Sequence, residues 1–92
     1  MKLLNLKYTT FKTFDRVKHV NCSLNLRWSK IESLGNLETV GGSLDLNNSS
    51  LLSLGNLKSV GRNLWLMNTP LSKKYTREQI REMVDVKGNV HL

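Results

Sequence analysis

The chain repeats itself every twenty residues, and this period limits its fold more than any other feature of the sequence. The segment Val40 to Val60, VGGSLDLNNSSLLSLGNLKSV, aligns without insertion or deletion on the segment Val20 to Val40, VNCSLNLRWSKIESLGNLETV. Apolar residues recur in fixed columns along this frame: Leu4, Leu24, Leu44 and Leu64; Leu6, Leu26, Leu46 and Leu66; Phe11, Ile31, Leu51 and Leu71; Val20, Val40 and Val60. Because each unit can stack its inward residues on those of the next unit, we expect a repeat architecture with one continuous core.

The alternation within each repeat predicts strands. Leu4 and Leu6 flank Asn5, the pattern of a short strand with one face turned inward. A unit of twenty residues leaves little room for a helix, so we expect strands and extended turns. The predicted fold class is mainly β, a parallel β-solenoid of about five 20-residue coils in a single domain over residues 1–92. The expected repeats are 1–20, 21–40, 41–60 and 61–71, followed by a helix-plus-strand cap over 72–92.

The segment after Pro70 interrupts the repeat and predicts a short C-terminal capping helix. Thr76, with Gln79 three residues later, forms the capping-box pattern of a helix start. The helical period places the apolar residues on an inward face, and these are Ile80, Met83 and Val84. The outward face is then largely charged, with Arg77, Glu78, Arg81 and Glu82. A polar outer face is what the end of a stacked array needs, so we interpret this helix as a cap.

Two further columns indicate how the corners of the coils are built. A hydroxyl residue recurs at Thr9, Ser29, Ser49 and Thr69, and we expect these hydroxyls to satisfy backbone groups of successive corners. Bends with backbone dihedrals that favour glycine are expected just before the strands, at Gly41, Gly42 and Gly61. A second bend is expected at Gly35–Asn36 and Gly55–Asn56.

The repeat resembles known solenoid families. The pattern L-x-L-x-x-[S/T]-x-Φ, where Φ is apolar, resembles the core of a short leucine-rich repeat, and SLGNLxxVGGSLDL is similar to the coils of receptor L domains, which form a right-handed parallel β-helix. With NTPLSKKYTxxxIRxMV and KGNVxL closing the array, the chain resembles small leucine-rich-repeat-like proteins encoded by bacteriophages and their bacterial hosts. The chain departs from the Gly-Gly pattern at Asn21–Cys22 and Gly61–Arg62. The resemblance implies a solenoid and, in function, an inhibitor that occludes a bacterial host or defence protein.

Composition and charge indicate in which cellular compartment the protein works and what kind of partner it binds. One cysteine, Cys22, excludes an internal disulfide and is typical of a reducing compartment. The sequence shows neither a signal-peptide pattern nor an apolar run long enough for a membrane span, so we expect a cytoplasmic protein, in the host cell if it is encoded by a phage. The formal net charge is +7, and residues 1–30 hold seven basic residues against one acid, a net charge of +6. A basic end suits an acidic protein surface, a nucleoprotein or a nucleic acid, and the alternative is a solvated face that favours solubility.

The sequence offers no recognisable catalytic or metal-binding pattern. His19 and His91 fall in different columns, and the acids form no paired or metal-ligating arrangement. The glycines recur with the coils and form no phosphate-binding loop. We therefore expect a protein that is not an enzyme and that uses no cofactor.

The outward positions of the predicted strands carry the functional prediction. Trp65, Met67 and His91 are expected to form one apolar patch flanked by polar and basic rows. Exposed Trp, Met and Tyr near Arg have the composition of an interface hot spot. The sequence thus favours a protein-protein interaction module, with a binding surface of Trp65, Met67, His91, Asp45, Asn47, Arg27 and Trp28. The alternative for the tryptophans is structural: Trp65 folds over the cap helix and Trp28 covers a corner.

The first coils could instead bind a nucleic acid or a second copy of the chain. Nucleic-acid binding is the alternative function, through Lys2, Lys7, Lys12, Arg16, Lys18, Arg27 and Tyr8, with aromatic rings stacking on bases. A homodimer is the third hypothesis, because nothing in the sequence covers the first coil and a second copy of the chain would pair with its edge.

Overall fold

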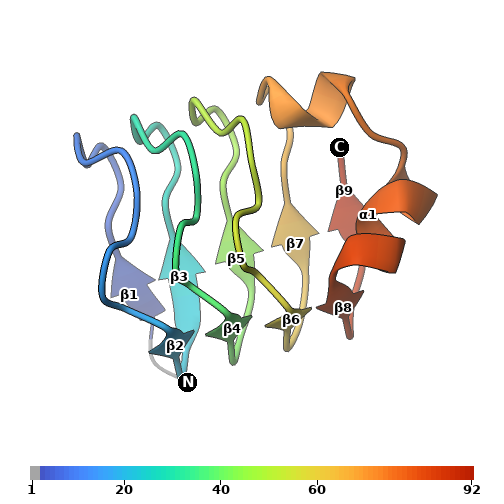
Figure 1. Cartoon of the computed structure of the whole chain (residues 1–92), viewed down its shortest axis with the longest axis horizontal. Helices are drawn as coiled ribbons and strands as arrows, with labels where there is room; N and C mark the ends of the chain where they lie inside the picture. The colour runs from blue at the N-terminus through green and yellow to red at the C-terminus, as the bar shows by residue number, and fades with distance from the viewer. Residues whose placement is uncertain (1–2) are drawn as a thin grey trace.

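The computed structural model describes residues 3–92, which wind into two parallel β-sheets (Figure 1). The five-stranded sheet consists, in spatial order, of β1 (Leu3–Asn5), β3 (Ser23–Asn25), β5 (Leu44–Asp45), β7 (Leu64–Trp65) and β9 (Val90–His91). The four-stranded sheet consists of β2 (His19–Val20), β4 (Thr39–Val40), β6 (Ser59–Val60) and β8 (Asp85–Val86). The protein is therefore mainly β, a parallel solenoid with one short C-terminal α-helix.

The twenty-residue period sets the register of both sheets. Leu44 pairs with Leu24 on one side and with Leu64 on the other, and all three side chains are fully buried. In the other sheet, Val40 pairs in the same way with Val20 and Val60. Each coil thus places the same side chain over the same position of the coil before it, which confirms the predicted repeat architecture.

The number of turns differs from the prediction. The structure has about three regular turns, formed by β1–β2, β3–β4 and β5–β6, so the prediction of about five coils is wrong. After β7 the chain forms a 3-10 helix, η1 (Leu71–Lys73), and a helix, α1 (Arg77–Met83), before it returns through β8, and β9 is a single strand. The L-x-L segments predicted the strands of one sheet correctly, but a complete turn also needs a regular return path, which the segment after Pro70 does not supply.

The core is continuous but thins toward the first coil. The leucine columns of the later coils are buried, whereas Leu4 is 42% exposed and Val17 is 43% exposed. In the column of Ile31, which is fully buried, Phe11 is 37% exposed. These first-coil side chains have no coil on their outer side within residues 3–92, so they lose the contacts that bury their equivalents. The predicted homodimer would use this end, and that hypothesis stays a prediction.

The predicted capping box starts α1. Thr76 is the N-cap: its hydroxyl accepts a hydrogen bond from the Gln79 backbone N–H at 3.2 Å, and the Gln79 side chain accepts one from the Thr76 N–H at 2.8 Å. Ile80 is fully buried, and the helix packs against β8 and β9 at the end of the row of coils (Figure 1). Val84, predicted on the same inward face, is buried and follows the helix in an extended conformation. Met83 lines the groove beside it but is 45% exposed, so its predicted burial is only partial.

The corner hydroxyls do not form the predicted ladder. Thr69 alone fits it, because its hydroxyl donates to the Leu66 carbonyl at 2.7 Å and accepts from the Ser72 N–H at 3.1 Å. Buried hydroxyl oxygens without a partner in the described chain belong to Thr9, Ser29 and Ser49. The corner backbone pairs with itself: the Ser29 N–H donates to the Leu26 carbonyl at 3.3 Å. The peptide groups that the hydroxyls were expected to satisfy are therefore already satisfied.

Within residues 3–92, neither helical segment combines the length and the apolar character needed to cross a lipid bilayer.

Candidate functional site

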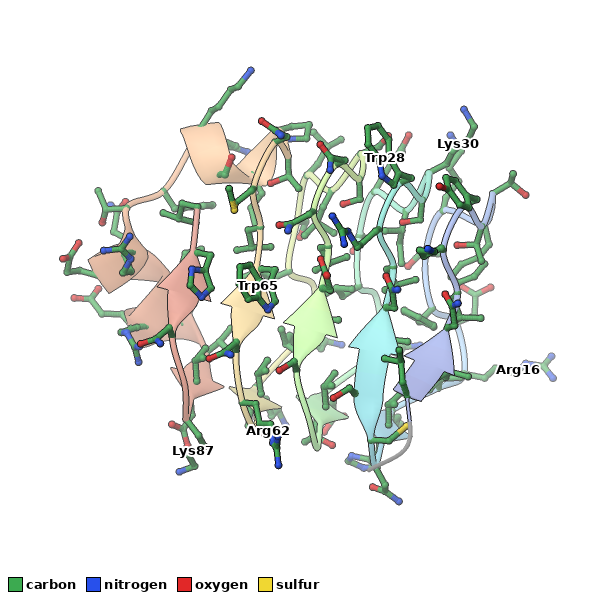
Figure 2. The ribbon with its side chains drawn as sticks, turned by 180° about the vertical axis from the view of Figure 1, so that it is seen from behind. Arg16, Trp28, Lys30, Arg62, Trp65 and Lys87 are labelled. Atoms are coloured by element: carbon green, nitrogen blue, oxygen red, sulfur yellow. The ribbon has the colours of Figure 1, made fainter. Side chains whose placement is uncertain are left out.

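The outer face of the five-stranded sheet carries the predicted binding residues. Leu24 and Leu26 are fully buried, while Asn25 between them faces outward and is half-buried, as the period of a strand requires. The same alternation along and just after β3, β5, β7 and β9 places on this face Arg27, Asp45, Asn47, Trp65, Met67 and His91. Figure 2 shows Trp65 on the side of β7 that faces the viewer, with no ribbon in front of it.

Trp65 and His91 form an aromatic stack on this face. β7 and β9 pair so that Trp65 lies opposite His91, and the two ring centroids are 3.8 Å apart with an interplanar angle of 10°. Met67, two positions beyond Trp65, is 42% exposed. The structure thus brings the two predicted aromatic residues into contact and leaves the methionine beside them open to solvent. The alternative in which Trp65 folds over the cap helix does not describe this arrangement, because the indole packs on a neighbouring strand.

The polar side chains of the same face also accept hydrogen bonds from backbone N–H groups and so stabilise the segments that follow the strands. Asp45 accepts a hydrogen bond from the Asn47 backbone N–H at 3.1 Å and lies 3.7 Å from the Arg27 guanidinium. The Asn47 side chain accepts from the Met67 N–H in the next coil at 2.8 Å. Equivalent bonds link Asn25 to the Arg27 N–H at 3.0 Å and Asn5 to the Lys7 N–H at 3.1 Å. This structural role was missed, although the recurrence of Asn or Asp at positions 5, 25 and 45 could have indicated it.

Trp28 and Tyr8 lie at a different place, the corner that follows each strand. Both have left-handed backbones, with φ of 58° at Trp28 and 62° at Tyr8. Their equivalents in the later coils are Asn48 and Asn68, the residue type that tolerates this conformation best after glycine. Trp28 is 54% exposed and Tyr8 is 66% exposed, so burial of the ring in the core does not explain an aromatic residue at either position. Two exposed aromatic rings thus occupy backbone positions that cost conformational energy, which is typical of functional positions.

We predict that Trp28→Asn is more stable than Trp28→Ala by about 0.5–1 kcal/mol. Both substitutions remove the indole, but only asparagine adopts the left-handed conformation at low cost. Urea denaturation followed by circular dichroism measures the difference. Equal stabilities would show that the corner imposes no conformational cost on residue 28.

The basic residues of the nucleic-acid hypothesis lie on more than one side of the first two coils. Lys7 lies over the Tyr8 ring, with its Nζ 5.7 Å from the ring centroid. Lys12 is paired with Glu32 at 3.2 Å. Figure 2 shows Arg16 extending from the first coil, away from the corner that carries Trp28. Lys18 is exposed beside β2, and Lys2 lies outside the described residues.

A pocket between α1 and β9 was not predicted. It has a volume of about 200 Å³ and is lined by Arg77, Arg81, Asn89, Val90 and His91. The sequence placed both arginines on the outward face of the cap, where a solvated role was expected. In the structure their guanidinium groups turn toward the last strands and donate to backbone carbonyls there. Nothing in the sequence indicated this, because the helical period does not say which side of α1 the final strand occupies.

A second, larger groove lies where α1 replaces the regular fourth turn. It has a volume of about 410 Å³ and is lined mainly by apolar side chains, among them Leu52, Leu57, Leu71, Tyr75 and Met83. Leu52 is 48% exposed there. The groove exists because η1 and α1 cover the third turn less completely than another regular turn would.

Comparison of the chain with protein-family models, with curated proteins and with solved structures gave no match. Within residues 3–92, no three side chains of His, Cys, Asp or Glu are grouped closely enough to hold a metal ion. The outer face of the five-stranded sheet, with its aromatic stack, remains the main candidate site.

Proposed function

We propose that this protein is a non-catalytic binding module that holds another protein against the outer face of its five-stranded sheet. The observation that carries the proposal is the Trp65–His91 stack beside the exposed Met67. Trp and Met are enriched at protein interfaces, and the rigid tryptophan ring displaces water there at low entropic cost. The stack supports this role because packing on His91 holds the indole in one orientation before a partner arrives.

The proposed partner presents an acidic surface. The chain carries a formal net charge of +7, and Arg27 lies on the binding face at the edge of the polar rows. Opposite charge on the partner would accelerate association and orient it on the sheet. The resemblance of the repeats to small leucine-rich-repeat-like proteins of phages and their hosts extends the proposal to inhibition of a bacterial host or defence protein in the cytoplasm.

Trp65→Ala is predicted to weaken binding of the protein partner by at least about tenfold, which is the loss expected of a hot-spot residue. The test is affinity capture from bacterial lysate, treated with nuclease, by the wild type and by two tryptophan variants in parallel. Trp28→Ala is the matched control, because Trp28 was predicted as part of the binding surface but lies at the corner and not on the sheet face. Each captured protein is then purified and its affinity measured against all three chains.

Loss of the same partner with Trp65→Ala and its retention with Trp28→Ala would support the sheet face. Equal capture by the wild type and Trp65→Ala would contradict the proposal. The amide spectrum of each variant shows whether the fold is intact, so that a loss of binding is not confused with unfolding.

Nucleic-acid binding by the first two coils is the second candidate, favoured by the exposed rings of Tyr8 and Trp28 at their left-handed corners. The Lys7 Nζ lies over the Tyr8 ring, so a base that stacks on the opposite face of the ring would have a cation close to its phosphate. The two functions differ in their response to salt, because phosphate contacts weaken steeply as salt rises. Lys7→Glu combined with Arg27→Glu would remove nucleic-acid binding, which Trp65→Ala would leave unchanged.

A further inference from the structure

The pocket between α1 and β9 is built around two arginines whose guanidinium groups are fixed in place. Arg77 donates from Nε to the Val90 carbonyl at 2.9 Å. Arg81 donates from Nη1 to the Val86 carbonyl at 3.1 Å and from Nη2 to the Gly88 carbonyl at 2.6 Å. The two residues are one helical turn apart, so they project from the same side of α1. Their hydrogen bonds to the last strands restrict the side chains before any ligand binds.

Within residues 3–92, no ion pair with a carboxylate neutralises the positive charge of this pair. The ion pairs within residues 3–92 are Lys12–Glu32, Arg27–Asp45, Lys58–Glu38 and Lys87–Asp85. Neither Arg77 nor Arg81 belongs to one. Arg77 uses only its Nε–H within the described chain, so both of its Nη groups remain as donors, and Arg81 likewise keeps donors beyond its two carbonyl bonds. A guanidinium group has no acceptor atom, so a ligand that pairs with these donors must supply oxygen acceptors.

His91 joins this pocket to the aromatic stack. It lines the pocket with the two arginines and Asn89, and its ring stacks on Trp65 at 3.8 Å. The pocket therefore opens beside the surface proposed to bind a protein. A volume of about 200 Å³ accommodates a single small anionic group rather than an extended ligand.

We propose that Arg77 and Arg81 form an oxyanion-binding site and that its occupant in the complex is a carboxylate of an acidic side chain of the protein partner. Paired guanidinium donors match the geometry of carboxylate and phosphate oxygens. The identity of the occupant rests on the proposed protein-binding function, whereas binding of an oxyanion does not. Beside the Trp65–His91 stack, this site selects a partner with an acidic residue next to an apolar or aromatic one.

The test uses the full chain without any partner. Sodium phosphate and sodium acetate are titrated separately at constant ionic strength, with sodium chloride as the reference, while NMR follows the Arg77 and Arg81 Nε–H signals and the His91 amide. We expect saturable shifts with both anions and at least a tenfold loss of affinity in Arg77→Gln and Arg81→Gln. Lys87→Gln removes a nearby cation that lines no part of the pocket, and it should bind as the wild type does.

Shifts that never saturate, or that persist in both arginine variants, would overturn the site. Arg81→Gln also removes two hydrogen bonds to β8 and the turn after it, so a loss of affinity in this variant could reflect a local change of structure. Arg77→Lys is therefore added as a variant that keeps the positive charge at position 77 but lacks the planar donor group. It should lose affinity while the amide signals of coils two and three stay in place. Binding of phosphate alone would overturn the carboxylate assignment in favour of a phosphorylated ligand. Failure of protein capture with intact anion binding would refute the proposed function and leave this site standing.

Discussion

Leu44→Ala is expected to lower the free energy of unfolding by about 3–4 kcal/mol. Leu44 is fully buried and lies in register between Leu24 and Leu64, so its side chain is enclosed by the coils on both sides. Truncation leaves a cavity that neighbouring coils cannot close without shifting their hydrogen-bonded strands. Urea denaturation, followed by circular dichroism, measures the loss.

The matched control is Leu4→Ala, in the same column and with the same chemistry. Leu4 is 42% exposed because no coil lies beyond it in the described chain, and its loss should cost less than about 1 kcal/mol. The contrast comes from the position of each leucine in the stack and not from its residue type. Similar losses at the two positions would contradict the stacked arrangement.

Gly55→Ala is expected to lower the free energy of unfolding by about 3 kcal/mol, for two separate reasons. The backbone at Gly55 has a φ of +56°, which L-residues adopt only at a cost. A Cβ at this position would also lie 2.5 Å from the Gly35 backbone nitrogen in the preceding coil, so the two coils would have to separate. The substitution therefore strains one corner and disturbs the stacking of two turns.

Gly41→Ala is the control for Gly55→Ala. It also replaces a glycine by alanine, but at a position without a left-handed backbone. Gly41, Gly42 and Gly61 all lack a left-handed φ, so the unusual dihedrals predicted at this bend are wrong. A Cβ on Gly41 would lie 3.1 Å from its nearest neighbours in Asn21. We expect a cost of about 1 kcal/mol or less for this substitution. Thermal unfolding of both variants provides the comparison, and a larger effect at Gly41 than at Gly55 would refute the interpretation.

The register of the solenoid could be predicted from the sequence because the apolar columns recur without a gap. A strand shifted by one residue would bury Asn25 or Asp45 and expose Leu24 or Leu44, so the pattern permits one alignment only. The number of turns could not be derived in the same way. The strand segment at Val90 matches the repeat, but the return path between β7 and β8 is made by helices whose direction depends on tertiary packing.

Part of the candidate site could also be predicted from the recurring columns of the repeat. The shared column of Trp65 and His91 predicted that they would be neighbours on the outer face, and the structure places them in contact. The orientation of Arg77 and Arg81 was not predictable, because it depends on carbonyl groups of β8 and β9 that become available only after α1 packs. The left-handed backbone at Trp28 was not predicted, although Asn48 and Asn68 in the same column are of the residue type that adopts this conformation most readily after glycine.

The central claim, that the partner lies on the outer face of the five-stranded sheet, is tested most directly by site-specific photo-cross-linking. In the test variant, a photoreactive amino acid replaces Met67 on that face. In the control variant, it replaces Lys58, which lies beside β6 in the four-stranded sheet. Both side chains are exposed, so neither replacement disturbs the core. We expect a cross-linked partner from position 67 and none from position 58. A cross-link from position 58, or none from position 67 while the partner remains bound, would contradict the central claim.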